Sequence, residues 1–156
     1  MKIKINVTSI GAAVTFILSL VAIILFSVAY NGCYGYFEMQ YPALPAVIGF
    51  GITAMLLSAA VIILPMIKAE GVAKKIIDIA TDVCIVLVCV FICLALVFAA
   101  KSSVYEMALT WGSELHINEP YMLSVCSNAL ASIIICVVAM LIMGVSACIT
   151  KKIYAK

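Results

Sequence analysis

Four long apolar runs, separated by short segments that hold most of the charges, divide this chain of 156 residues. A helix rises about 1.5 Å per residue, so roughly 20 apolar residues cross a hydrocarbon layer of about 30 Å. Each of the four runs is long enough to do so. The pattern therefore predicts membrane-spanning helices at residues 7–29, 45–67, 76–100 and 121–149.

Composition indicates that lipid, rather than water, surrounds these helices. Hydrophobic residues make up 67% of the sequence and charged residues 10%, and a water-soluble domain of this size could not bury so much apolar surface. The formal net charge of +2, without a basic patch, argues against nucleic acid as a partner. The sequence thus predicts an all-α membrane protein with one domain over residues 1–156.

The lysines lie almost entirely on one side of the predicted helices. The head of the chain, the loop at 68–75 and the tail from Lys151 together hold eight of the nine lysines. The other loops hold the remaining lysine and four acids: Lys101, Glu38, Glu106, Glu114 and Glu119. Basic loops stay in the cytoplasm, so we expect a multi-pass protein of the cell membrane with both termini cytoplasmic. Short loops make neighbours antiparallel, which predicts an antiparallel four-helix bundle.

A secretory signal peptide is the alternative interpretation of the first run. Lys2 and Lys4 precede it, and Ser27-Val28-Ala29 resembles a cleavage site. The apolar part of a signal peptide is about 7–15 residues long. The run here is clearly longer, which favours a membrane span.

Aromatic residues gather in the predicted outer segments. After the third span, apolar residues recur at helical spacing up to Trp111 and Leu115. This predicts a short amphipathic outer helix between the third and fourth spans, which lies on the membrane surface or extends the third span outward. The segment after the first span is rich in tyrosine, which favours an interfacial belt over a ligand-binding patch. We expect Tyr30, Trp111 and Tyr121 to anchor the helices at the outer interface.

Asp78 and Asp82 are the only acidic residues inside a predicted span. Four residues apart, they share one face of a helix. If the span begins at Ile76, Asp82 lies about 9 Å inside the membrane, where an ionised carboxylate costs about 2–3.5 kcal/mol. One interpretation is a proton or cation site. The other, which we favour, is that the helix begins a turn earlier, near Val72, so that both acids lie close to its positive end and to nearby lysines.

Small and polar residues recur at helical spacing on two spans. The fourth span carries Ser124, Asn128, Ser132 and Cys136, and the first carries Thr15, Ser19 and Ala22. In membranes such stripes bring helices into close contact, with groups such as the Asn128 amide bonded across the interface. A solute pathway lined by the same groups is the alternative.

Most of the cysteines fall within apolar runs, where they behave as small hydrophobic residues. Cys89 and Cys93 are four residues apart but lack further metal ligands, so we expect packing and no metal or other cofactor. Cys33 and Cys126 lie nearest the outer surface. The first and fourth helices of a bundle are neighbours and the outer side is oxidising, so a disulfide between these two is a hypothesis.

The sequence offers no nucleophile with a base, no phosphate loop and no metal cluster, so we do not expect an enzyme. Two functions remain. The first is a non-enzymatic accessory or structural subunit that binds another membrane protein or itself. The alternative is a small proton- or cation-coupled transporter that uses Asp82 and Asn128.

Overall fold

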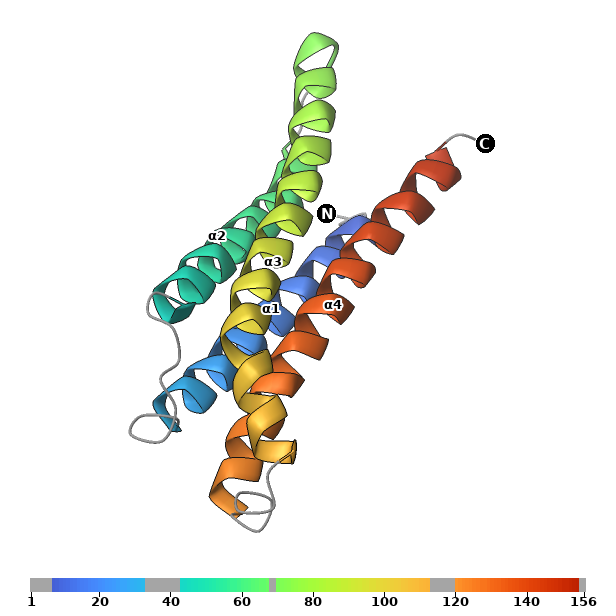
Figure 1. The fold of residues 1–156 in the computed structure, drawn as a ribbon. Coiled ribbons are helices and arrows are strands. Elements are labelled where there is room, and N and C mark those ends of the chain that lie inside the picture. Colours follow the sequence, from blue (N-terminus) through green and yellow to red (C-terminus); the bar gives the residue numbers. More distant parts are fainter. Residues whose placement is uncertain (1–6, 33–42, 68–69, 113–119, 155–156) are drawn as a thin grey trace.

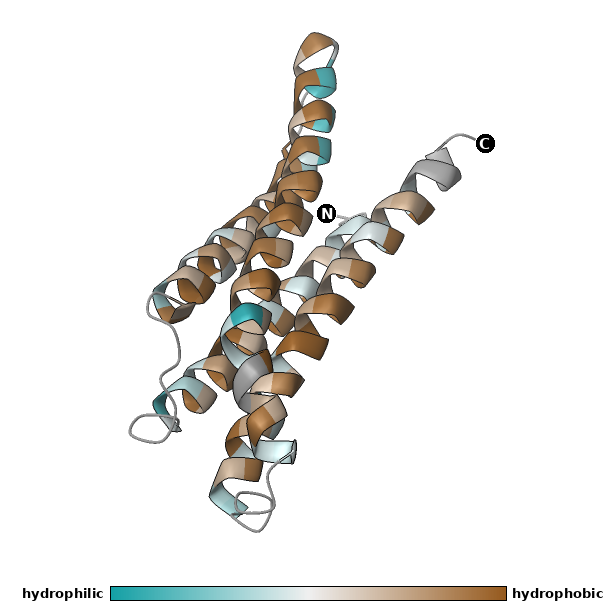
Figure 2. Ribbon diagram, in the orientation of Figure 1, coloured by the Kyte–Doolittle hydropathy of each residue, from teal (hydrophilic) through white to brown (hydrophobic). Residues whose placement is uncertain are grey.

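A computed structural model describes residues 7–32, 43–67, 70–112 and 120–154, and these are almost wholly helical. Figure 1 shows α1 (Val7–Gly32), α2 (Ala43–Ile63), the 3-10 turn η1 (Leu64–Met66), α3 (Val72–Gly112) and α4 (Pro120–Tyr154). The four α-helices are long and apolar enough to cross a membrane. Hydrophobic residues predominate along them (Figure 2). The predicted class, an all-helical chain with four apolar helices, is confirmed.

Proline and glycine set the boundaries where the sequence places them. Pro65 lies in η1, just after the last residue of α2, because its ring and missing N–H end a regular α-helix. The turn closes when the Ile67 N–H donates to the Leu64 carbonyl at 3.2 Å. Gly71 then adopts a positive φ of 60° before α3 begins, a conformation that glycine tolerates without steric cost. Pro120 is the first residue of α4, the position where proline is best accepted.

Helix α3 is longer at both ends than the predicted third span. It begins at Val72, a turn before Ile76, and continues for 41 residues to Gly112. At about 1.5 Å per residue it is about 60 Å long, roughly twice the thickness of a hydrocarbon layer. Of the two interpretations of the segment after the third span, the structure shows the extension: residues 101–112 continue α3 and do not form a separate helix. No glycine or proline interrupts the chain between Ala100 and Trp111, so nothing there ends the helix.

Each helix packs mainly against two others, in the cyclic order of the chain. The extensive contacts join α1 to α2 and α4, and α3 to α2 and α4. Helices α1 and α4 run in opposite directions, since Thr8 bonds to Thr150 at one end and Gly32 to Tyr121 at the other. In Figure 1 the Val72 end of α3 and the Tyr154 end of α4 diverge.

The core is built largely from small side chains at alternating spacings of four and three. On α1 the buried residues with this spacing are Thr8, Ala12, Thr15, Ser19, Ala22, Phe26 and Ala29. On α4 they are Ala129, Ser132, Cys136, Ala139, Met143, Ser146 and Thr150. This repeat of 3.5 residues keeps one seam of each helix facing its partner. Small side chains let the two backbones approach closely, as in helix pairs of membrane proteins.

Candidate functional site

Among the described residues, four side-chain hydrogen bonds between α1 and α4 lie at intervals along the whole pair. They are Thr8 Oγ1 to Thr150 Oγ1 (2.7 Å), Thr15 Oγ1 to the Ala139 carbonyl (3.3 Å), Ser132 Oγ to the Ala22 carbonyl (2.9 Å) and Tyr121 O–H to the Gly32 carbonyl (2.6 Å). We call this contact the α1–α4 seam. Three of the four bonds end on a backbone carbonyl, which requires each donor helix to approach the main chain of the other.

Glycines make the seam close enough for these bonds. A Cβ added to Gly11 would overlap the Oγ of Ser146, and one added to Gly32 would lie 2.7 Å from Cγ2 of Val125. A methyl group at Gly11 would require α4 to move, because Ser146 Cβ is fixed on its backbone, and one at Gly32 would require at least the Val125 side chain to move. Gly11 and Gly32 lie near the two ends of α1, so the close approach extends along the pair.

The residues predicted to mediate helix packing fall in different places. Thr15, Ser19 and Ser132 are buried, whereas Ser124 is exposed and Asn128 is half-buried. A spacing of four drifts about 40° per step around a helix of 3.6 residues per turn. Over the two steps from Ser124 to Ser132 the stripe therefore rotates from the outside of α4 into the seam. Ser146 and Thr150, seam residues that the sequence analysis missed, follow the alternating spacing instead.

Asp78 and Asp82 lie on the outside of the bundle. Both are exposed, and α3 contributes no buried residue between Val72 and Leu87. The helix does begin at Val72, as the favoured interpretation of the acid pair requires. By helical spacing the two acids project from the flank of α3 opposite Phe91 and Phe98, and those rings pack on Phe50 of α2 with centroids 6.1 and 5.6 Å apart. The acids therefore face away from α2.

The register of α2 against α3 gives the depth of Asp82. Val47 and Gly51 of α2 line the same cavity as Ala95 and Ile92 of α3. Because the two helices run in opposite directions, counting forward along α2 and backward along α3 from this level places Asp82 beside about Ala60. Ala60 precedes the end of the apolar run at Ile67 by seven residues, or about 10 Å along a helix. Asp82 thus lies at the depth of apolar α2 residues, on an outward flank.

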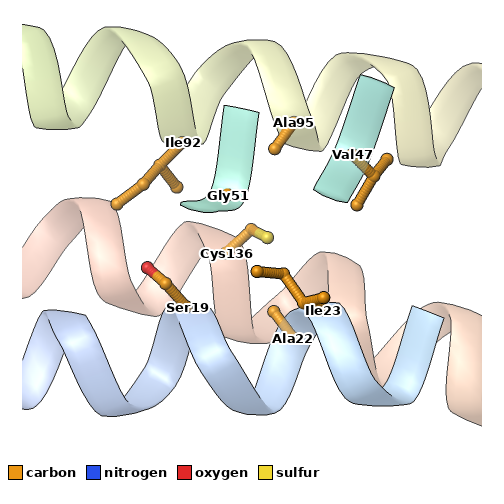
Figure 3. Close-up of a pocket in the computed structure, with 8 residues that line it drawn as sticks. All are labelled: Ser19, Ala22, Ile23, Val47, Gly51, Ile92, Ala95 and Cys136. Carbon is orange, nitrogen blue, oxygen red and sulfur yellow. The ribbon is translucent and has the colours of Figure 1, made fainter. Parts of the chain in front are cut away.

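All four helices meet around one small cavity (Figure 3). Its volume is about 10 Å³, and it is lined by Ser19, Ala22, Ile23, Val47, Gly51, Ile92, Ala95 and Cys136. A Cβ on Gly51 would lie 2.6 Å from the Ile23 side chain, so α1 and α2 approach closely at its edge. The only polar side-chain atoms in the lining are the hydroxyl of Ser19 and the thiol of Cys136.

The predicted aromatic anchors have separate surroundings. Trp111 and Tyr121 are exposed, and the Tyr121 hydroxyl also donates across the α1–α4 seam. Tyr30 is half-buried and its ring lies 6.4 Å from that of Phe26. Tyr30 and Tyr121 therefore contribute to packing where α1 ends and α4 begins, and anchoring in lipid stays a prediction for all three.

Six of the seven cysteines lie among the described residues, all as free thiols. No three metal-binding side chains come together among the described residues. Cys126 is a buried free thiol, while Cys33 lies outside the described residues, so the bridge between them stays a prediction. Comparison of the chain with protein-family models, with curated proteins and with solved structures finds no match.

Proposed function

We propose that the four helices cross the cell membrane as an antiparallel bundle with both termini in the cytoplasm. The protein then acts as a non-enzymatic accessory or structural subunit that binds another membrane protein. The lengths and apolar character of the helices support the crossing. The gathering of eight of the nine lysines on one side of the spans supports the orientation.

The functional proposal rests on one observation: the polar groups inside the bundle form hydrogen bonds that join one helix to another. In the described part, the seam hydroxyls of Thr8, Thr15 and Ser132 are occupied by bonds between helices. The cavity at the four-helix junction has a volume of about 10 Å³, too small for a hydrated solute. A transport pathway needs polar groups that are accessible along a route, whereas these groups hold helices together.

We place the partner on the exposed side of the first part of α3, from Val72 to Leu87, whose other side packs on the core through Cys84 and Ile85. Between Val72 and Leu87 no residue is buried, although α1 and α4 are closely packed at their own cytoplasmic ends. Exposed Ile79, Val83 and Val86 make this surface apolar, and Asp78 and Asp82 add carboxylates on its flank. A transmembrane helix of another protein can cover these apolar residues.

Site-specific photo-crosslinking in cells tests this assignment. A photoreactive amino acid at Val83, which is 51% exposed, should give a discrete adduct with a second membrane protein. The matched control is Ile24 on the outward face of α1, with a similar exposed fraction of 53%. Adducts of equal yield at the two positions, or none at Val83, would contradict a partner on α3.

One observation favours the alternative, a small proton- or cation-coupled transporter. Asp82 lies at the depth of apolar α2 residues, where ionisable side chains often have a function. Asn128, the second residue of that hypothesis, precedes Ser132 on the outer part of α4. Asp82 lies in the inner half of the bundle, so the two would act at different depths and not at one site.

A further inference from the structure

Three of the four helices extend furthest at the end of the bundle where α1 ends and α4 begins. One packed cluster joins all four helices just before that end: Phe26, Ala43, Val47 and Ala99, with Ile133 packed against them. Ala43 is the first residue of α2, so in the described part of the chain only α1, α3 and α4 continue past the cluster (Figure 1). Lys101 follows Ala99 by two residues and therefore lies just beyond the cluster.

The exposed surface of α3 and α4 is wholly apolar on one side of Lys101. On α3 every exposed residue between Val83 and Ala100 is hydrophobic, and on α4 the same holds between Ala129 and Ile149. We call these two stretches the apolar belt. They are about 27 and 32 Å long, close to the thickness of a hydrocarbon layer, about 30 Å. The belt alone is therefore long enough for one crossing of a membrane.

Polar side chains reach the surface on the other side of Lys101. Ser124 and Ser127 of α4 are exposed, as are Lys101 itself and Asn31 at the end of α1. The candidate span of α4 runs for 31 residues to Thr150, about 46 Å, which is more than one crossing needs. The exposed serines lie in the part of α4 that the apolar belt leaves over.

The part of the bundle beyond the belt has buried contacts of its own. We call residues 27–32 of α1, 101–112 of α3 and 120–128 of α4 the three-helix cap. The Tyr121 O–H in this cap donates to the Gly32 carbonyl at 2.6 Å. Its buried side chains include two methionines and a cysteine: Met107, Met122 and Cys126. Packing and hydrogen bonding therefore join the three helices without any contribution from lipid.

We propose that the lipid headgroups meet the bundle at the level of Lys101, and that the three-helix cap stands beyond the hydrocarbon. The Lys101 ammonium group then lies beside the lipid phosphates, and Ser124 and Ser127 face water or headgroups instead of acyl chains. This inference rests on the proposed membrane crossing and adds the position of one membrane surface on the protein.

The proposal changes the environment of Trp111. This residue lies ten positions after Lys101, about 15 Å further along α3. The headgroup layer on each side of a membrane is only about 5–8 Å thick. Trp111 is then in water beyond the headgroups, in contrast to the lipid anchor that the sequence predicts.

Two engineered cysteines on one face of α4 test the level of the headgroups. Ser127→Cys lies in the cap, and Ile134→Cys lies seven residues, or about 10 Å, further into the belt on the same face. Each is made in a cysteine-free background and exposed to a water-soluble maleimide in opened membrane vesicles, so the result does not depend on the orientation of the termini. We expect Ser127→Cys to react roughly tenfold faster or more, because hydrocarbon excludes both the reagent and the thiolate.

The other outcomes separate this proposal from the crossing on which it rests. Equally slow reaction of both cysteines would overturn the cap and leave the crossing in place, since hydrocarbon would then reach Ser127. Equally fast reaction of both, or faster reaction of Ile134→Cys, would contradict the crossing and the cap with it.

The fluorescence of Trp111, the single tryptophan of the chain, gives an independent test in liposomes. Aqueous iodide should quench it, and lipids with brominated acyl chains should change it little. The control is Trp111→Phe with Leu141→Trp, because Leu141 lies in the belt and is 56% exposed; brominated lipids should remove most of its emission. Strong quenching of Trp111 by brominated lipids would overturn the cap, and weak quenching of the control would contradict the crossing as well.

Discussion

Replacing Gly11 by alanine should disrupt the α1–α4 seam near its Thr8–Thr150 end. The added Cβ would overlap Ser146 Oγ and lie 2.5 Å from Ser146 Cβ. Ser146 cannot simply rotate away, because its Cβ is fixed by the α4 backbone. The helices must therefore separate, which also weakens the nearby bond between Thr8 and Thr150 at 2.7 Å.

The expected cost is the sum of two terms. Overpacking in a close-packed interior costs about 1–3 kcal/mol. A hydrogen bond between helices in a membrane adds about 0.6 kcal/mol. Alanine is intrinsically better than glycine inside a helix by about 0.8–1 kcal/mol, which offsets part of the loss. We expect Gly11→Ala to destabilise the protein by roughly 1–3 kcal/mol on balance.

Reversible unfolding of the purified protein in mixed micelles can measure this loss. Gly49→Ala on α2 is the matched control, because a Cβ there meets nothing within 4 Å, and it should be neutral or stabilising. The double variant Gly11→Ala with Ser146→Gly restores the space and should recover most of the overpacking loss. If Gly11→Ala is no less stable than Gly49→Ala, or if the double variant recovers nothing, the close approach of α1 and α4 is wrong.

Two further predictions concern single polar groups. Ser132→Ala removes the bond to the Ala22 carbonyl and should lower the free energy of unfolding by about 1 kcal/mol, measured in the same assay. Ser124 is exposed, so Ser124→Ala should change that free energy by less than about 0.5 kcal/mol. Equal effects of the two substitutions would show that Ser132 does not bridge the helices. Asp82→Asn should leave insertion and folding intact, because it removes a charge that costs about 2–3.5 kcal/mol inside a membrane. Cation or proton flux in proteoliposomes separates the two functions: flux lost in Asp82→Asn but kept in Asp78→Asn would favour the transporter over the accessory subunit.

The sequence predicts the helices well because length and charge are local properties. The spans at 7–29, 45–67 and 121–149 each fall within one helix or its terminal turn. The apolar run places the end of the third span at Ala100, because Lys101 follows it. A lysine does not end a helix, so continuation beyond Ala100 was one of the two interpretations that the sequence allowed. The extension of α3 beyond Ala100 depends on helix propensity, which continues unbroken from Ala100 to Trp111.

The α1–α4 seam was predicted only in part, because its register depends on how two distant helices meet. Thr15, Ser19 and Ser132 have the small polar character that suits such a contact, and the structure buries them. The pairing of Gly11 with Ser146 joins positions 135 residues apart, and no local pattern specifies it. The outward position of Ser124 follows from helical drift, which is visible only once the buried face is known.

The measurement that tests the membrane arrangement most directly is the accessibility of two engineered cysteines. Ala69→Cys lies in the loop between α2 and α3, and Glu114→Cys follows α3, each made in a cysteine-free background. With a membrane-impermeant thiol reagent on intact cells, we predict that Glu114→Cys is labelled and that Ala69→Cys reacts only after the membrane is opened. Labelling of Ala69→Cys with protection of Glu114→Cys would contradict the orientation, and labelling of both or neither would contradict the crossing of α3.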